Sequence, residues 1–513
     1  MDRTKLLSGL AVAMVLLVYI LYLSISLTRP IIFGDEGFHA AVSKLMRDDA
    51  TYHKWYPLFY DTADAKGGFV RPPLLYMIFS GFALAGWNEF IIKMVIPLFS
   101  VLTALLLFLW IRDLVSAEAG LFAAFLFLMI PSQVTYAVLF YSDGLFLLMV
   151  MASLLFFHKF IKTEKPIFLT LTAVFTSLSL LTKTSGPIML LFMLLYPFMT
   201  TERKKFLMAG LKVLIVVFIL MTPWFVRNFA LYGSPTCDNF PIVPGFFSSA
   251  GCNFGAPEQS SQEFSGRAAE VGSEAELIKF GLLNFFAFSY GNPLLILLLV
   301  GGIALCVINR NNYFSVPLVF LLSSLVLFKF ATGRVEDAAR YVLPVVIPVS
   351  VVAAIYASKL ISFEKKHFKY AGIIIILIFA ALVAQPGLAK VSVMSSVKQF
   401  SPAFVEANQW LKLNTAKDSV VLSLWTAATV YHSERRAMWS VAELGDILLT
   451  NTDEKVLPPL RKHGVNYILV AKFSISDQAY QQTYPIQFVN YLQSSNHFKN
   501  VFENTDTVIF QVV

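Results

Sequence analysis

Long apolar stretches recur along the first 388 residues and are separated by short polar segments. The first stretch, 6–27, follows Arg3 and Lys5 and reaches the roughly 20 apolar residues that a helix needs to cross a bilayer. Some of the others are shorter than this, and together they are 91–111, 119–137, 144–160, 166–181, 187–199, 207–228, 281–308, 314–332, 341–360 and 370–388. The pattern predicts a mostly α-helical, polytopic transmembrane bundle of about 11–13 spans.

The stretch 73–87 is apolar but short, so it is either a span or a re-entrant or interfacial segment. Lys and Arg favour cytoplasmic loops, and this rule separates the two alternatives. If 73–87 does not cross, the basic clusters of the later turns all share the side of Arg3 and Lys5: Arg112, Lys159 with Lys162 and Lys165, Arg203 with Lys204 and Lys205, Arg310, and Lys365 with Lys366 and Lys369. We therefore predict about eleven full spans, one short insertion and a cytoplasmic N-terminus.

This topology places three segments outside the cytoplasm: the loop 28–72, the acidic loop 229–280 and the tail 389–513. The chain therefore divides into a transmembrane domain, 1–388, and a soluble extracytoplasmic α/β domain in the tail. Within the tail, we expect helices over 401–414, where Ser401 is the N-cap, and over 453–464. Strands are expected over 418–425 and 465–472, followed by two short strands around a turn at the C-terminus.

The composition supports a membrane protein. Of 513 residues, 57% are hydrophobic and 14% are charged, whereas an average soluble domain is about 25% charged. This excludes a soluble enzyme, a secreted scaffold or a coiled coil as a description of the whole chain. The net charge of +8 reports cytoplasmic loops and not nucleic-acid binding. Cys237 and Cys252 share one outer loop, where they either form a disulfide or remain two thiols.

An acidic cluster follows the first span. Gly34 breaks the chain, and Asp35 and Glu36 then open a helix that also contains His39. Acids in a first turn can simply complement the helix dipole. An outer carboxylate over the membrane can instead accept a proton from a hydroxyl or hold a metal. Glu36 and His39 are three residues apart and share a helix face, a spacing compatible with a divalent metal.

Four further polar clusters lie at predicted span ends on the outer side. They contain Arg71 before two prolines, Asp143, Lys183 among hydroxyl residues, and Arg340 near two acids. Each has a structural interpretation: membrane anchoring for Arg71 and Lys183, a helix cap for Asp143, and a loop salt-bridge network for Arg340. The alternative is a binding site, because charges at the membrane are costly and these cations suit a lipid phosphate.

The ordered clusters resemble integral-membrane glycosyltransferases of the GT-C fold, above all the protein O-mannosyltransferase group and the aminoarabinose transferase that modifies lipid A. The resemblance covers roughly residues 30–350 and rests on Gly34-Asp35-Glu36, Arg71-Pro72-Pro73, Tyr141-Ser142-Asp143, Thr182-Lys183 and Arg340-Tyr341. The aminoarabinose transferase has an acid before its basic-Pro-Pro motif, where this chain has Phe69 and Val70. That departure argues against transferring the relative's metal site.

The resemblance implies a polyprenyl- or dolichyl-phosphate sugar donor, from which a hexosyl or pentosyl group passes with inversion to a lipid, glycan or protein acceptor. It assigns Asp35 as the general base and Asp143 as the residue that positions the acceptor or Asp35, or binds a metal. Arg71, Lys183 and Arg340 are expected to bind the donor phosphate. The further substrate-binding residues are expected to be Glu36, His39, Tyr141 and Tyr341. The site and the tail would face outward from the cell membrane.

Two other functions fit parts of the sequence. A transporter or flippase for a lipid-linked glycan would place charges deep within spans and contain repeats, whereas these charges gather at outer span ends and no repeat is found. A non-catalytic scaffold that works through its tail would tolerate the loss of Asp35. In the tail, Trp425, Tyr431 and Trp439 either stack on sugar or pack in the core.

Overall fold

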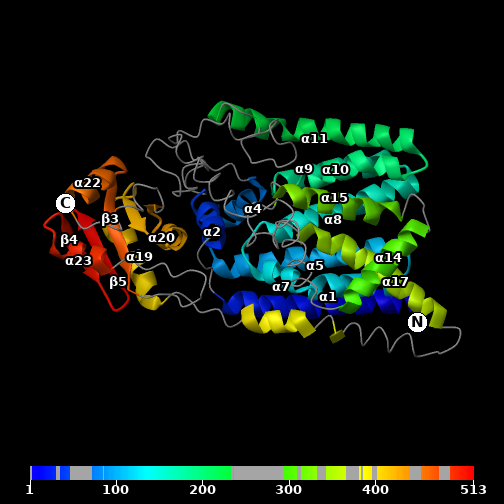
Figure 1. Cartoon of the computed structure of the whole chain (residues 1–513), viewed down its shortest axis with the longest axis horizontal. Helices are drawn as coiled ribbons and strands as arrows, with labels where there is room; N and C mark the ends of the chain where they lie inside the picture. The colour runs from blue at the N-terminus through cyan, green and yellow to red at the C-terminus, as the bar shows by residue number, and fades with distance from the viewer. Residues whose placement is uncertain are drawn as a thin grey trace.

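The computed structural model combines a helical bundle with a C-terminal α/β unit at one end (Figure 1). It describes residues 3–29, 35–46, 72–84, 86–183, 185–232, 235, 293–308, 314–331, 343–364, 381–382, 385–394, 401–438, 447, 452–472 and 486–513. The predicted span 370–388 lies mostly outside these residues, and so do most of the two predicted outer loops, with Cys237 and Cys252.

Five described segments are long and apolar enough to cross a membrane: Leu6–Thr28 in α1 (Arg3–Thr28), α5 (Glu89–Leu114), α8 (Asp143–Thr163), Arg203–Ala230 in α11 (Arg203–Tyr232) and Leu343–Leu360 in η3 (Leu343–Val345) and α17 (Val346–Glu364). A sixth candidate is the pair α6 (Ala117–Met129) and α7 (Pro131–Val138), which bends by 68°. Pro131 explains the break, because proline cannot continue the hydrogen-bond ladder. The chain is therefore a multi-pass membrane protein.

The other apolar helices among the described residues are shorter. They are α4 (Leu74–Leu84), α9 (Pro166–Leu180), α10 (Ile188–Leu195) with η1 (Tyr196–Met199), α14 (Pro293–Ile308) and α15 (Ser315–Ala331). Each coincides with a predicted apolar stretch. The 11 residues of α4 are too few to cross a bilayer alone, which agrees in length with the insertion predicted over 73–87.

Two helices of the bundle expose apolar side chains on its surface. Leu17 and Ile20 on α1 are exposed, and so are Phe218 and Ile219 on α11. In Figure 1, α11 lies at the top of the bundle and α1 near its bottom, with α5, α8 and α9 between them. Exposed leucine, isoleucine and phenylalanine at such positions are the expected surface of a helix that faces lipid.

The C-terminal unit is a five-stranded sheet with helices. Its strand order is β2-β1-β3-β5-β4, with β2, β1 and β3 parallel and the β3–β5 and β5–β4 pairs antiparallel. The elements in chain order are α19 (Pro402–Asn414), β1 (Val420–Ser423), α20 (Thr426–Ser433), β2 (Arg436–Met438), α22 (Asp453–Lys462), β3 (Val465–Ala471), α23 (Ile486–Ser494), β4 (Phe498–Glu503) and β5 (Thr507–Val512). The predicted mixed α/β fold of the tail is confirmed. The pattern did not predict α20, β2 or α23.

The predicted N-cap of α19 is confirmed as well. The Ser401 side-chain oxygen accepts a hydrogen bond from the Phe404 backbone N–H at 3.1 Å, and Pro402 occupies the first helical position. Phe404 is buried beneath this cap. The cap therefore fixes where α19 begins and holds this helix end over the core of the C-terminal unit.

One apolar core joins the C-terminal unit to the membrane bundle. Ala40, Ala41 and Leu45 of α2 (Asp35–Leu45) belong to the same buried cluster as Trp425 and Tyr431. The latter two residues are therefore core residues in this structure, and Trp439 lies outside the described residues. The shared core seats the sheet unit against α2.

Candidate functional site

A buried ion pair fixes the start of α2. Arg29, which follows α1, donates from its two terminal nitrogens to the two oxygens of Glu36 at 2.9 and 3.0 Å. Glu36 also accepts a hydrogen bond from the backbone N–H of Phe140 at 2.8 Å. Both charged side chains are buried. Glu36 therefore ties together the end of α1, the start of α2 and the segment that follows α7.

Asp35 is the first residue of α2, and its side chain lies outside the described part of the structure. Its backbone directly precedes Glu36, so the Arg29–Glu36 pair also fixes the position from which the Asp35 side chain extends. The predicted general base therefore stands on an anchored helix end, one residue before a buried carboxylate.

His39 lies one turn further along α2. Its Nδ1 is 2.7 Å from the hydroxyl of Tyr76 on α4, and its ring meets the rings of Phe140 and Tyr141 edge-on. His39 is buried, and Tyr141 is partly buried. The structure thus brings the acidic cluster next to the segment that contains Tyr141, as the predicted site requires.

Asp143 and Lys183 form a second buried ion pair. Asp143 is the first residue of α8, and the ammonium of Lys183, in the turn after α9, donates to its Oδ1. Both residues are buried, so Lys183 does not extend to the membrane surface as an anchoring lysine would. Asp143 is likewise not the helix cap, because Ser142 occupies that position.

The Lys183 turn is held next to the proline motif. The backbone N–H of Leu74, directly after Pro72-Pro73, donates to the carbonyl of Leu181 at 2.8 Å. Within the turn, a Cβ on Gly186 would lie 2.6 Å from Leu180 Cα. The turn can pack this closely only because Gly186 has no side chain.

Four of the five sequence motifs therefore converge. The start of α2 contacts the segment 140–141, Asp143 contacts Lys183, and the residues after Arg71 contact the chain beside Lys183. Arg71, Arg340 and Tyr341 lie outside the described residues. The two acids that the site buries, Glu36 and Asp143, are each compensated by a cation, which buried charges require.

Arg29 and Tyr76 belong to the site but were not predicted from the sequence. The available signal for Arg29 was a charge placed directly after the first apolar stretch. Nothing in the sequence pointed to Tyr76, because a tyrosine in an apolar helix is common.

The predicted metal ligands have other contacts. Glu36 is engaged by Arg29 and by the Phe140 backbone, and His39 contacts Tyr76. In the part of the chain that the structure describes, no three His, Cys, Asp or Glu side chains gather as a metal site would require. A metal on Glu36 and His39 stays a prediction.

Residues 70–226 match the family of dolichyl-phosphate-mannose-protein mannosyltransferases. This region contains the proline motif, Asp143 and Lys183. No curated protein matches the chain in sequence. The similarity to solved structures is much broader than the family match, and it extends beyond the membrane helices.

Two kinds of solved structure share the fold. An oligosaccharyltransferase from Archaeoglobus fulgidus, in complex with Zn and sulfate, is 14% identical, with 89% of this chain and 67% of that chain covered and a TM-score of 0.63. ArnT from Cupriavidus metallidurans, bound to undecaprenyl phosphate, is 13% identical, with 98% of this chain and 97% of that chain covered and a TM-score of 0.62. The AglB oligosaccharyltransferase from Archaeoglobus fulgidus, in complex with an inhibitory peptide and a dolichol-phosphate, is 14% identical. The match covers 89% of this chain and 69% of that chain, with a TM-score of 0.60. The resemblance to GT-C membrane glycosyltransferases is confirmed at the level of the fold.

Proposed function

We propose that this chain is a membrane glycosyltransferase that moves a sugar from a polyprenyl- or dolichyl-phosphate donor to an acceptor hydroxyl, with inversion at the anomeric carbon. The observation that carries the proposal is the convergence of the start of α2, the residues after Arg71, the segment 140–143 and Lys183. The family match over 70–226 and the lipid phosphates bound by two structures of the same fold support this donor class.

Asp35 acts as the general base in this proposal. The acceptor oxygen attacks the anomeric carbon, its proton passes to the Asp35 carboxylate, and the bond between that carbon and the phosphate oxygen breaks. A carboxylate is a weak base, but it can take the proton late, as the attack develops. The Arg29–Glu36 pair supports this role by fixing the backbone next to Asp35.

The departing lipid phosphate needs positive charge. Lys183 is buried beside Asp143, so its ammonium is already oriented in a water-poor environment, where a charge interaction is stronger than in water. Arg71 and Arg340 are the other proposed phosphate ligands. Asp143 would then orient Lys183 as well as the acceptor. The substrate-binding site would be lined by Tyr141, Tyr341 and His39.

The reaction is proposed to occur outside the cytoplasm. The positive-inside pattern supports a cytoplasmic N-terminus and a C-terminal unit on the outer side. Cysteine accessibility at positions 88 and 112 tests this topology, because residue 112 must be protected from an impermeant outer reagent. A bridge between Cys237 and Cys252 belongs to the same proposal and requires an oxidising compartment.

The decisive experiment measures transfer by purified protein in lipid. Radiolabelled polyprenyl-phosphate sugars are supplied, and sugar release is compared between wild type, Asp35→Asn and Asp113→Asn. Asp113, at the end of α5, is a partly exposed carboxylate paired with Arg112, so its variant controls for the loss of one acid. We expect sugar release by wild type and by Asp113→Asn, and none by Asp35→Asn. Movement of intact donor across the bilayer without release would favour a flippase, and full activity of Asp35→Asn would remove Asp35 as the base.

A further inference from the structure

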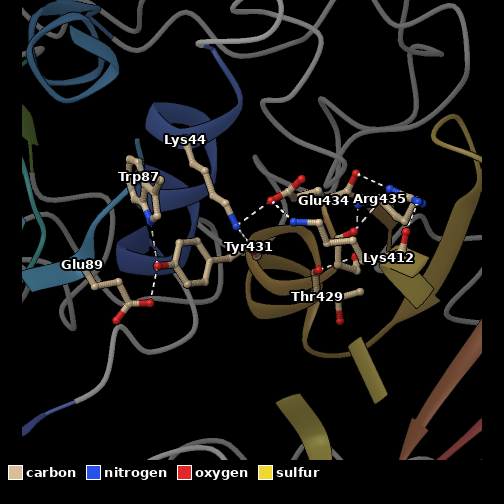
Figure 2. Close-up of polar contacts among 9 residues, drawn as sticks. Lys44, Trp87, Glu89, Lys412, Thr429, Tyr431, Glu434 and Arg435 are labelled. Atoms are coloured by element: carbon tan, nitrogen blue, oxygen red, sulfur yellow. Dashed lines mark hydrogen bonds and ion pairs between the residues drawn. The ribbon is translucent and has the colours of Figure 1, made fainter. Parts of the chain in front are cut away.

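The C-terminal unit contacts the helix that begins with Asp35. Lys44, near the opposite end of α2, has its ammonium 2.8 Å from Glu434 Oε1 and donates to the Tyr431 backbone carbonyl at 3.1 Å. The same ammonium lies 5.1 Å from the centre of the Tyr431 ring, within the range of a cation–π interaction. Figure 2 shows Lys44 reaching from α2 to both residues of the C-terminal unit.

Tyr431 extends this contact to a second membrane helix. Its hydroxyl donates to Glu89, the first residue of α5, and accepts a hydrogen bond from the Trp87 indole N–H at 3.1 Å (Figure 2). Burial, with a smaller effect of the Glu89 charge, raises the pKa of Tyr431 well above its usual range. The phenol is therefore a neutral donor at physiological pH, and one side chain joins α20 to the start of α5.

An apolar contact surrounds these polar groups. Ala40, Ala41 and Leu45 on α2 are buried in the same cluster as Trp425 and Ala428 on or beside α20. The polar contacts of Lys44 and Tyr431 thus belong to a packed interface, where close packing fixes the relative position of two helices.

Both ends of α2 are therefore anchored. Arg29 anchors the start through Glu36, and the C-terminal unit anchors the other end through Lys44. Lys44 lies nine residues after Asp35, about 14 Å along a helix that rises 1.5 Å per residue. A helix of 11 residues moves as one body, so a displacement at Lys44 reaches Asp35.

We propose that Lys44 and Tyr431 are positioning residues: they dock the C-terminal unit on α2 and thereby set the position of Asp35 for sugar transfer. The proposal rests on the proposed function for its catalytic part, because it assumes that Asp35 reacts. Its structural part, the docking of α2 by α20, can be measured without any substrate.

The chain offers a matched control. Glu434 has two lysine partners, Lys44 at 2.8 Å and Lys412 at 2.7 Å. Lys412 belongs to α19, within the C-terminal unit, and its contact does not involve α2. Lys44→Met and Lys412→Met thus each remove one lysine from the same carboxylate, but only the first removes a contact with α2.

The experiment combines hydrogen exchange over α2 with transfer kinetics, both on the full-length protein in lipid. We expect Lys44→Met to speed amide exchange in α2 and to lower kcat about tenfold, in the range of effects that misplaced reacting groups produce. The donor KM should stay within about twofold, because the phosphate ligands are untouched. Tyr431→Phe, which keeps the packed ring, should act in the same direction. Lys44→Arg should restore both measurements, and Lys412→Met should leave both unchanged.

Several results would overturn the proposal. Unchanged exchange over α2 in Lys44→Met and Tyr431→Phe would refute the docking, and faster exchange with an unchanged kcat would refute the positioning role. An equal effect of Lys412→Met would show that the contact between Lys44 and Glu434 contributes only to the general stability of the protein. If wild type releases no sugar from any donor, the proposed function fails, while the exchange measurement still decides whether α20 docks α2.

Discussion

Arg29 and Glu36 form a bidentate ion pair that joins the end of α1 to the start of α2, and both side chains are buried. Such a pair combines charge with fixed geometry. Its net contribution to stability is limited by the cost of removing both charges from water. The pair nevertheless specifies one arrangement of α2, because either charge alone would remain buried without compensation.

We expect Arg29→Met to destabilise the protein by about 3–5 kcal/mol, the usual cost of leaving one partner of a buried pair alone. The double variant Arg29→Met/Glu36→Leu should recover most of this loss, because no unpaired charge remains. Arg112→Met is the control, since Arg112 and Asp113 form a partly exposed pair worth at most about 1 kcal/mol. Denaturation in detergent measures the free energy of unfolding of all three variants. Equal losses for Arg29→Met and Arg112→Met would contradict the prediction.

The periodicity of the sequence predicted most elements of the fold. The helix capped by Ser401 and the strands β1, β3, β4 and β5 were predictable from local patterns. The short elements α20 and β2 were not, because eight and three residues contain too little periodicity to separate them from a loop.

The motifs of the site were visible in the sequence, but their partners were not. Asp143 and Lys183 were each identified, yet nothing local pairs two residues that are 40 positions apart. The Lys44–Glu434 contact spans most of the chain and depends on where α20 docks. Long-range pairing is set by the packing of the whole fold, and local patterns in a single sequence do not determine it.

Gly186 allows a test of the Lys183 turn. Because its Cβ would lie 2.6 Å from Leu180 Cα, we expect Gly186→Ala to shift the turn and move Lys183. Transfer should fall about tenfold or more, since small displacements of reacting groups are costly. Gly81→Ala on α4 is the control, because nothing lies within 4 Å of its added Cβ. An equal effect of both variants on transfer would show that the tight turn has no special role.

The C-terminal unit should become less stable in mild acid. Burial lowers the pKa of His432 from 6.5 to about 4, with Glu89 acting in the opposite direction and Lys44 in the same direction. The folded state thus favours neutral His432, so its stabilisation is present above pH 6.5 and is lost as the pH falls towards 4. Between pH 7 and pH 5 we expect the free energy of unfolding to fall by about 2 kcal/mol.

Glu434 titrates in a separate pH range. Its burial acts to raise the pKa, but hydrogen bonds from Lys412 and Lys44 outweigh this effect and lower it from 4.5. Its stabilisation is therefore lost only below that value. Denaturant unfolding of wild type and His432→Gln at pH 7 and pH 5 checks the assignment. An unchanged loss in His432→Gln would show that another group is responsible.

Exchanging the two charges of the Asp143–Lys183 pair tests whether the pair has only a structural role. If the pair serves structure alone, Asp143→Lys/Lys183→Asp should restore both stability and transfer. If Lys183 stabilises the leaving phosphate, the exchanged pair should restore folding but place an acid where the phosphate departs. We expect folding to recover much of the roughly 3–5 kcal/mol that either single change costs, while transfer stays at least about a hundredfold below wild type. Transfer at the wild-type rate in the exchanged variant would make Lys183 a structural residue and leave Arg71 and Arg340 as the phosphate ligands.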